Sequence, residues 1–278
     1  MQIAHLILAH KNPTQLKRLI ASISNADSLI FVHIDLKTKI DSFKGLEGLP
    51  NVAFIKKRIS VNWGGYSQVQ VVLNSFKEIL HQMPAVSYIN LLSGQDYPIV
   101  KVDRFHEFLK ASPDFTYMEY REEPSKWIYE AKARFSQYHL TDMSLPGKYK
   151  VEKLLNWVLP KRNWPSNFQL VGRSTWFTMS RECTEYILKF VSENKKFLKC
   201  FKLSWGADEL FFQTILFNSP LRPKLINNNL RYIDWSEGKP NPKLLSENDI
   251  HKIEVSVCFF ARKFNEEDKV LDYLDKRL

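Results

Sequence analysis

Two adjacent carboxylates, Asp208 and Glu209, stand directly before the apolar run of residues 210–217 (LFFQTILF). The spacing predicts a helix over residues 208–217, with both acids in its first turn. A carboxylate there can act as a general base that removes a proton from a hydroxyl group. It can equally be a first-turn acid that complements the helix dipole, and either acid would then be dispensable. A helix amino terminus lowers the pKa of a carboxylate, so a base here needs burial or a hydrogen-bonded partner to restore its basicity.

A pair of cations, Arg262 and Lys263, follows the apolar run of residues 257–261, which predicts a strand. Cationic side chains at a strand end can neutralise a departing diphosphate. They can also be ordinary surface charges, but two in succession at the edge of a sheet favour a binding role. Lys252 is a further candidate cation in this part of the chain.

Polar residues also follow three apolar runs in the first hundred residues. His10 and Lys11 follow the first run, Asp35 follows the second, and the segment 93–96 (SGQD) follows the fourth. If these runs are parallel strands, their carboxyl ends meet at one edge of the sheet, which is the usual ligand site of such folds. Asp35 can instead be a plain turn residue, and a lone histidine such as His10 is more often structural than catalytic.

Few residues have the types and spacing of a metal site. The chain contains no Asp-x-Asp motif, and the nearest pattern, residues 247–249 (END), lies in a polar stretch that does not follow a strand. The three cysteines, Cys183, Cys200 and Cys258, are far apart and form no CxxC pair. This spacing argues against a zinc site or a disulfide framework and fits reduced thiols in a cytoplasm.

The composition is basic. The 278 residues include 40 Lys and Arg against 30 Asp and Glu, a formal net charge of +10, which attracts nucleic acids, nucleotide phosphates and anionic membrane surfaces. There is no RRM, KH or zinc-finger signature, so nucleic-acid binding is not expected. No apolar stretch approaches the roughly 20 residues of a membrane span, and residues 1–13 lack the features of a signal peptide. We expect a cytoplasmic location, with peripheral contact at the inner face of the membrane as an alternative.

The elements that must position these residues alternate along the chain. Strands are expected at residues 3–9, 29–34, 52–55 and 86–92, and helices at 14–24 and 66–82. Residues 114–167 are less regular and rich in Tyr, Trp, Arg and Glu. Beyond them, strands are expected at 175–180, 230–235 and 257–261, and helices at 182–192, 208–217 and 266–276. This rhythm predicts an α/β fold in which helices flank a mostly parallel central sheet, in a single domain over residues 1–278.

Several segments, in order along nearly the whole chain, together resemble one known family. They are residues 4–11 (AHLILAHK), 31–35 (FVHID), 61–67 (VNWGGYS), 90–98 (NLLSGQDYP), 172–181 (GRSTWFTMSR), 207–216 (ADELFFQTIL), 230–235 (LRYIDW) and 259–264 (FFARKF). The chain resembles the core-2/I-branching β-1,6-N-acetylglucosaminyltransferase family, which also includes the peptide O-xylosyltransferases. Each segment is weak alone, and their combination is specific.

The resemblance implies a GT-A-type fold, an inverting transfer from a UDP-sugar, and independence from metal ions and other cofactors. It divides the domain into a nucleotide-binding half, 1–112, and an acceptor and catalytic half, 113–278. Vertebrate members carry a stalk, a membrane anchor and disulfides, which are not found here. The chain therefore looks like a compact bacterial member that builds a surface polysaccharide or glycan. GlcNAc is the favoured sugar, with xylose and galactose as alternatives.

The resemblance also selects site residues. It assigns the catalytic base to Glu209 and a phosphate-binding role to Lys263. Part of the family has an arginine near the position of Lys252 that is missing here, which leaves the second cation open between Arg262 and Lys252. The remaining residues expected to bind the UDP-sugar are Ala9, His10, Asp35, Trp63, Gly64, Ser93, Gly94 and Asp96.

The acceptor site is predicted from residue types alone. Sugars bind aromatic faces together with carboxylate and amide groups. The candidates of these types are Glu119, Arg121, Trp176, Tyr232, Asp234 and Trp235. The aromatic residues can equally be core, Trp176 most of all. In the same way, Trp63 and the following Gly64-Gly65 can be a tight turn with a packing aromatic rather than a flexible binding loop.

One amphipathic segment, residues 148–165 (KYKVEKLLNWVLPKRNWP), allows two interpretations. Its apolar face consists of Val151, Leu154, Leu155, Val158 and Leu159, and its cations are Lys148, Lys150, Lys153, Lys161 and Arg162. A basic amphipathic helix with tryptophan can lie on an anionic membrane, which would suit an acceptor linked to a lipid. It can also pack its apolar face on the core and leave the basic face in water, and we favour this packing.

Two other classes of function remain as alternatives. One is a nucleotide-sugar-binding protein without turnover, although the presence of both Glu209 and Lys263 argues against it. The other is a binder of nucleic acid or anionic surfaces driven by net charge, which would show strong salt dependence and no affinity for UDP.

Overall fold

The structure is a computed structural model that describes residues 1–165, 167–266 and 268–278. Its strands are β1 (Gln2–Ala9), β2 (Ser28–Ile34), β3 (Val52–Phe54), β4 (Val86–Ser93), β5 (Asp96–Pro98), β6 (Thr116–Arg121), β7 (Gly172–Ser180), β8 (Leu225–Ile226), β9 (Arg231–Ile233) and β10 (Phe260–Arg262). Its α-helices are α1 (Pro13–Ser22), α2 (Tyr66–Gln82), α3 (Val102–Ala111), α4 (Lys126–Phe135), α5 (Lys148–Val158), α6 (Arg181–Glu193), α7 (Lys195–Lys202), α8 (Phe211–Phe217), α9 (Ile250–Glu254) and α10 (Lys269–Asp275).

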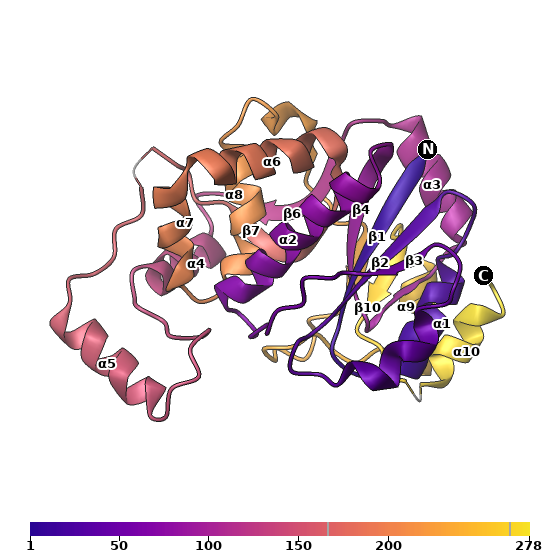
Figure 1. Cartoon of the computed structure of the whole chain (residues 1–278), viewed down its shortest axis with the longest axis horizontal. Helices are drawn as coiled ribbons and strands as arrows, with labels where there is room; N and C mark the ends of the chain where they lie inside the picture. Colours follow the sequence, from indigo (N-terminus) through magenta and orange to yellow (C-terminus); the bar gives the residue numbers. More distant parts are fainter. Residues whose placement is uncertain (166, 267) are drawn as a thin grey trace.

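A seven-stranded sheet in the order β3-β2-β1-β4-β7-β6-β8 forms the centre of the molecule. The strands β3, β2, β1 and β4 are parallel to one another, β7 is antiparallel to both β4 and β6, and β8 is parallel to β6. Helices α2 and α6 cover one face, and α1, α3 and α10 pack on the other (Figure 1). The predicted α/β fold with a mostly parallel sheet between helices is confirmed.

The burial of strand β1 explains why its sequence is mainly apolar. Ile3 and Ile7 pack into the core beneath α1, α3 and α10, whereas Ala4 and Leu6 pack into the core beneath α2. All four are fully buried because both faces of the sheet are covered. The strand is thereby fixed in place, and the loop that follows it begins at a defined point.

A second, three-stranded sheet has the order β5-β10-β9. Strand β10 runs antiparallel to β5 and parallel to β9, and Arg262 stands opposite Asp96 in the register. Since β5 follows β4 after a short turn, this sheet brings a late segment of the chain to the carboxyl end of β4.

A buried arginine connects the two sheets. Arg231 of β9 donates hydrogen bonds from Nη2 to the carbonyl oxygens of Leu91 and Phe177, each at 2.9 Å, and also to the side chain of Asn90. Burial lowers the pKa of Arg231 to about 10, so the side chain stays cationic at neutral pH. The hydrogen bonds compensate for the loss of water around the charge.

The irregular middle of the sequence contains more structure than predicted. Strand β6 and helix α4 form there, and α3 precedes them. The apolar positions of α3, namely Val102, Phe105 and Leu109, have helical spacing that sequence analysis missed. The expected helix over 208–217 is broken: a 3₁₀ turn, η2 (Ala207–Glu209), comes first and α8 begins at Phe211. The expected helix over 266–276 is shorter, and its residue Glu267 lies outside the described residues.

Helix α5 corrects the favoured interpretation of residues 148–165. The helix forms, but it ends at Val158 and has no buried residue. It projects from the body of the molecule beyond α4 (Figure 1). The prediction that its apolar face packs on the core is therefore wrong. Within the described chain, no helix is both long and apolar enough to cross a membrane.

Candidate active site

A pocket of about 580 Å³ opens where the carboxyl ends of β1, β2 and β4 meet. Its wall includes the loops after these strands, the start of α2, strand β7, the turn η2 and the segment after β10. The three loops that were expected to converge do so, because the parallel order β2-β1-β4 places their strand ends side by side.

Most of the predicted donor residues from the first half of the chain line this pocket. Ala9, His10, Asp35, Trp63 and Ser93 all contribute to its wall. His10 lies beside Lys11 and Lys263, and partial burial together with these two charges lowers the pKa of His10. The imidazole is therefore neutral at pH 7 and can donate or accept a hydrogen bond.

The carboxylate of Asp35 is already engaged by the backbone. Its Oδ1 accepts a hydrogen bond from the N–H of Lys37 at 2.8 Å, and its Oδ2 accepts one from the N–H of Val61 at 3.1 Å. The first of these bonds is that of an Asx turn. Asp35 therefore joins two loops of the pocket and still presents a carboxylate to its interior.

Two predicted donor residues lie behind the wall rather than in it. Asp96 is fully buried, accepts hydrogen bonds from the N–H and hydroxyl of Ser93, and lies 3.1 Å from Nε of Arg262. Gly64 accepts a hydrogen bond through its carbonyl from the N–H of Gly206 at 2.8 Å. Asp96 therefore positions Ser93 and Arg262, and Gly64 positions the backbone at Gly206, directly before η2.

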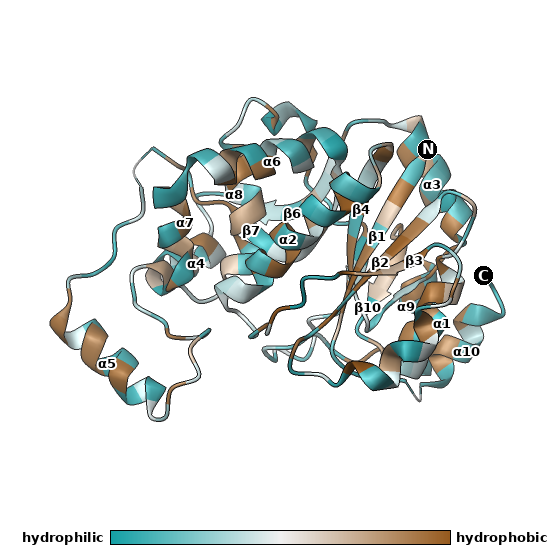
Figure 2. Ribbon diagram, in the orientation of Figure 1, coloured by the Kyte–Doolittle hydropathy of each residue, from teal (hydrophilic) through white to brown (hydrophobic). Residues whose placement is uncertain are grey.

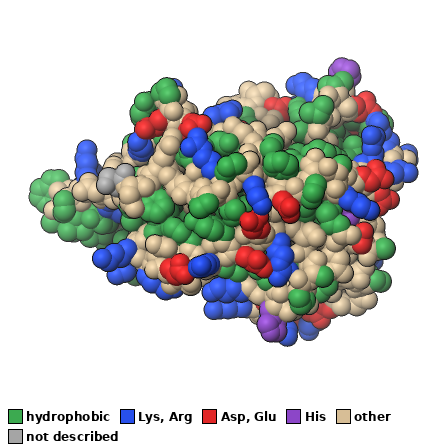
Figure 3. All heavy atoms as spheres, turned by 90° about the horizontal axis from the view of Figure 1, so that it is seen from above, with side chains coloured by type: hydrophobic (Ala, Val, Ile, Leu, Met, Phe, Trp, Pro, Cys, Tyr) green, Lys and Arg blue, Asp and Glu red, His purple; other side chains and the backbone are tan. Residues whose placement is uncertain are grey.

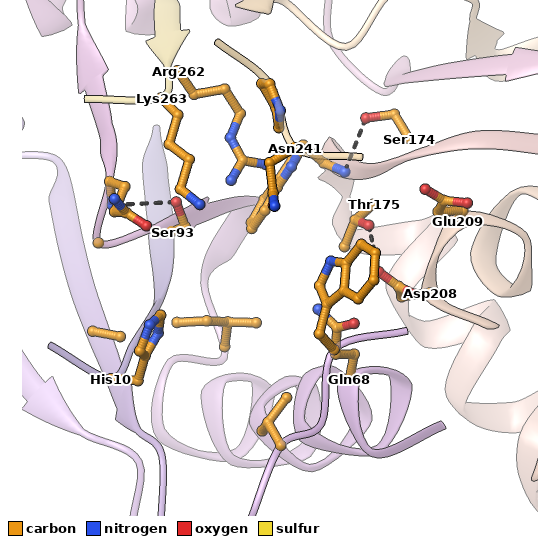
Figure 4. Close-up of a pocket in the computed structure, with 18 of the residues that line it drawn as sticks. His10, Gln68, Ser93, Ser174, Thr175, Asp208, Glu209, Asn241, Arg262 and Lys263 are labelled. Carbon is orange, nitrogen blue, oxygen red and sulfur yellow. Dashed lines mark hydrogen bonds between the residues drawn. The ribbon is translucent and has the colours of Figure 1, made fainter. Parts of the chain in front are cut away.

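The cationic end of the pocket is formed by Arg262 and Lys263 (Figure 4). The guanidinium of Arg262 is stacked on the ring of Trp176, with Cζ 4.0 Å from the ring centroid, and is paired with Asp96. Lys263 has no carboxylate within ion-pair distance among the residues that the structure describes. Burial and the charges of Arg262 and Lys11 lower the pKa of Lys263, so an anion bound here would relieve the repulsion among these cations.

The acidic end of the pocket is formed by Asp208 and Glu209 of the turn η2, on the opposite side of the cavity from Lys263 in Figure 4. The Oδ2 of Asp208 accepts a hydrogen bond from the hydroxyl of Thr175 at 2.6 Å. Glu209 is only partly covered, and its Oε2 lies 3.4 Å from Nη1 of Arg134. The carboxylate of Glu209 is therefore the one available to a molecule in the pocket.

Two glycines allow η2 to sit against the sheet. Gly206 has a φ of +76°, and a Cβ there would lie 2.9 Å from Nη1 of Arg134. Gly172, at the start of β7, would place a Cβ 2.1 Å from the carbonyl oxygen of Glu209. A side chain at either position would displace the turn or the cation beside it.

The pKa of Glu209 is raised by the burial that sequence analysis required for a base at this position. Burial and the neighbouring charge of Asp208 raise it from 4.5 to about 7, while Arg134 and Arg173 act in the opposite direction. Burial also raises the pKa of Asp208. Glu209 stands directly before the amino-terminal end of α8, and its burial supplies the compensation that this position requires of a base. Such a carboxylate is well matched to proton transfer at neutral pH.

Arg134 was not found by sequence reasoning. It lies on α4 and stacks between Trp127 and Trp205, with Cζ 5.4 Å and 4.8 Å from the two ring centroids. This packing holds the guanidinium against Glu209. The two residues are 75 positions apart in the sequence, so no local pattern could have joined them.

The predicted acceptor residues divide into two groups. Glu119, Trp176 and Trp235 line the pocket. Arg121, Tyr232 and Asp234 do not line the pocket. Arg121 forms an ion pair with Glu119 at 3.8 Å, and Tyr232 packs on the core. Asp234 accepts a hydrogen bond from the N–H of Ser236. Lys252, the alternative second cation, also lies outside the wall and is 3.9 Å from Asp234.

Several lining residues were missed because their types carry no signal alone. They are Lys37, Gln68, Arg173, Thr175 and Asn241. The side chain of Gln68 accepts a hydrogen bond from the N–H of Gly64 at 2.8 Å, and Arg173 lies 3.8 Å from Glu119. Among the described residues, no group of three or more His, Cys, Asp or Glu side chains is arranged to hold a metal ion.

Comparison with known proteins decides the family. A family model described as Core-2/I-Branching enzyme matches residues 3–256. The chain belongs to the Core-2/I-branching enzyme family. The resemblance noted from the motifs is thereby confirmed, and the fold agrees with the GT-A-like arrangement that it implied.

Similar proteins of this family include three named xylosyltransferases. A xylosyltransferase of Ciona intestinalis is 23% identical over 100% of this chain and 34% of its own length. Xylosyltransferase 2 of Rattus norvegicus is 25% identical over 100% of this chain and 34% of its own length. Xylosyltransferase 1 of Homo sapiens is 26% identical over 95% of this chain and 29% of its own length. The chain thus spans about a third of the length of the curated relatives that it matches.

Proposed function

We propose that this protein is an inverting glycosyltransferase that moves a sugar from a UDP-sugar to a hydroxyl group of a glycan acceptor. One observation carries the proposal: a single pocket has an unneutralised lysine, Lys263, at one end and a carboxylate with a raised pKa, Glu209, at the other. Family membership and the names of the relatives support the same reaction class.

The chemistry assigns one task to each end of the pocket. Glu209 removes the proton of the acceptor hydroxyl while the oxygen forms a bond to the anomeric carbon. The bond from that carbon to the diphosphate breaks on the opposite side, and its electron pair leaves with UDP. Because the displacement is a single step, the anomeric configuration is inverted.

The developing charge on the diphosphate would be met by side chains instead of a metal ion. Lys263 is the principal candidate since it lacks a carboxylate partner in the part of the chain described, whereas Arg262 is already paired with Asp96. Preorganised cations in a covered site stabilise a leaving phosphate strongly. We therefore propose a metal-independent reaction.

The rest of the pocket suggests where the remaining parts of the substrates bind. Asp35 and His10 lie at the strand ends suited to the ribose and uracil. Trp176, Trp235 and Glu119 also line the pocket and provide aromatic faces and a carboxylate for binding sugars. GlcNAc is our first candidate for the donor sugar. Xylose is the second candidate, and it is the sugar that appears in the names of the relatives. We further propose a role in surface polysaccharide or glycan synthesis.

The test is calorimetric titration of the protein with UDP in excess EDTA. Wild-type protein is expected to bind UDP without metal, and Lys263→Ala is expected to bind about tenfold to a hundredfold more weakly, as for loss of a hydrogen bond to a charged group. Lys252→Ala, which changes a cation outside the pocket, is the matched control and should bind as wild type does.

A donor screen then tests the transfer itself. UDP-GlcNAc, UDP-xylose and UDP-galactose are offered with glycan acceptors, and Glu209→Gln should bind UDP normally while losing transfer. Binding that appears only after Mn²⁺ is added would refute the metal-independent site. Absence of UDP binding under both conditions would refute the UDP-sugar proposal as a whole.

A further inference from the structure

Helix α5 exposes an apolar surface that lies outside the pocket described above. The side chains of Leu154, Trp157 and Val158 are 56%, 83% and 62% exposed, and Tyr149 at the start of the helix is 75% exposed. Figure 2 shows brown, hydrophobic turns on this helix although it stands apart from the core. Figure 3 shows hydrophobic side chains gathered at one end of the molecule, with Lys and Arg side chains nearby.

The outward orientation of this surface is fixed by polar contacts on the other side of α5. Glu152 accepts a hydrogen bond from the N–H of Leu140 at 2.9 Å and lies 3.3 Å from His139. Asn156 exchanges two hydrogen bonds of 2.8 Å with the backbone of Tyr138. The helix is therefore held to residues 138–140 by its polar side, and its apolar side faces away from the protein.

A second anchor fixes the end of the segment. The N–H of Arg162 donates to the carbonyl of Ser136 at 2.9 Å, and its guanidinium donates to the carbonyls of Gln137, Leu203 and Cys200. Arg162 is thus a structural anchor, not one of the free cations of the helix. The exposed position of α5 is a built feature of the fold.

The charge around the apolar surface is strongly one-sided. Lys150, Lys153 and Lys161 are exposed, and Lys148 is partly exposed. The one acidic residue between positions 143 and 165 is Glu152, which is occupied by its contacts with residues 139 and 140. A helix with apolar side chains, a tryptophan and lysines beside them has the composition of helices that lie in a membrane interface.

We propose that α5 docks this protein on an anionic lipid bilayer, with Leu154, Trp157 and Val158 inserted at the interface and the lysines facing the headgroups. Each lysine near such a surface adds to the attraction, and apolar burial adds the rest. A second copy of this chain is a poorer occupant, because a two-fold contact would bring the lysines of the two helices together. Docking is independent of the proposed sugar transfer and goes beyond it.

The root of the α5 segment is tied to the pocket. Asp142 accepts hydrogen bonds from the hydroxyl of Ser67 at 2.5 Å and from its N–H at 3.0 Å, and the side chain of Asn62 is 3.4 Å away. Asn62 and Ser67 flank Trp63, which lines the pocket. A bilayer that holds α5 therefore holds a segment in direct contact with the rim of the active site.

The experiment is co-flotation of the full chain with vesicles of phosphatidylcholine, with or without phosphatidylglycerol. Wild-type protein is expected to float with the anionic vesicles and to be released by salt. The double variant Leu154→Ser/Trp157→Ser removes apolar contacts, and Lys150→Glu/Lys153→Glu reverses two charges. Each should reduce partitioning about tenfold or more.

Matched controls place the same changes elsewhere. Val255→Ser/Val257→Ser alters exposed apolar residues next to α9, and Lys196→Glu/Lys199→Glu reverses exposed charges on α7. Both should float as wild type does. The fluorescence of Trp157, compared with that of Trp157→Phe, should shift to the blue with anionic vesicles alone.

Several results would overturn docking on a bilayer. Docking would be refuted if the wild-type protein did not float with anionic vesicles, or if it floated equally well with neutral ones. It would also be refuted if the α5 variants floated as well as wild type. Another such result is a dimer in solution, detected by light scattering, that is lost in Leu154→Ser/Trp157→Ser, since the surface would then bind a second copy. UDP titration of the same samples separates the two proposals, because α5 touches none of the residues assigned to catalysis.

Discussion

The cation beside the proposed base offers the sharpest test of the active site. Replacing Arg134 with methionine removes the charge while keeping an unbranched side chain between Trp127 and Trp205. Because Arg134 lowers the pKa of Glu209 from the level set by burial and by Asp208, its removal should raise that pKa above the present value of about 7.

The size of the change follows from the separation of 3.4 Å between Nη1 of Arg134 and Oε2 of Glu209. Two unit charges at this distance interact by roughly 5 kcal/mol at an effective dielectric constant of about 20 and by roughly 1 kcal/mol in bulk water. Both side chains are partly exposed, so the lower part of this range applies. We expect the pKa of Glu209 to rise by about one to two pH units, since about 1.4 kcal/mol corresponds to one unit.

The assay is the pH profile of kcat/KM for sugar transfer. Glu209 acts as a base only when deprotonated, so the acidic limb of the profile should move to higher pH in Arg134→Met. Activity should fall about tenfold or more near neutral pH and recover in alkaline buffer. Arg134→Lys keeps the charge and should leave the limb close to its original position. An acidic limb that stays unchanged in Arg134→Met would refute the idea that Arg134 sets the basicity of Glu209.

Three further predictions concern stability. Folding raises the pKa of Glu209 from 4.5 to about 7, so wild-type protein loses stability as the pH rises through this range. Glu209→Gln carries no charge at this position and should therefore be more resistant to urea than wild type at pH 8. Near pH 4 the difference in resistance should vanish. Gly206→Ala should lose about 1 to 2 kcal/mol in urea unfolding, since it strains a positive φ and pushes on Arg134, and wild-type stability would contradict this. Arg231→Leu should cost about 3 to 5 kcal/mol in the same assay because it leaves the carbonyls of Leu91 and Phe177 unpaired, whereas the exposed Lys196→Leu should be near neutral.

The parts of the fold that could be predicted from the sequence share one physical cause. Strands β1, β2 and β4 are covered on both faces, so each appears as a mainly apolar run that is followed by polar residues. Because parallel strands have their carboxyl ends at the same edge of a sheet, the sequence alone predicts that Ala9, Asp35 and Ser93 lie at one edge. Helix α2 was predicted with its observed bounds, because its apolar spacing is regular from end to end.

The rest depends on contacts between distant segments. Asp96 is one of the four residues of a short polar motif, and nothing in that motif shows that its side chain turns away from the pocket toward Arg262. The basicity of Glu209 depends on Arg134, which lies on another helix. Periodicity showed correctly which residues of α5 share a face, but it carried no information on whether another part of the protein covers that face.

The second sheet has a consequence for the order in which the site is made. The loops after β1, β2 and β4 are synthesised first, and the base on η2 follows. Arg262 and Lys263 reach the pocket only when β10 has paired with β5 and β9, the last pairing to become possible as the chain is made. A nascent chain can therefore fold its large sheet and present the carboxylate of Glu209 before it has the cations proposed to bind phosphate. Occupation of the pocket by a nucleotide would then report that the last of its segments is in place.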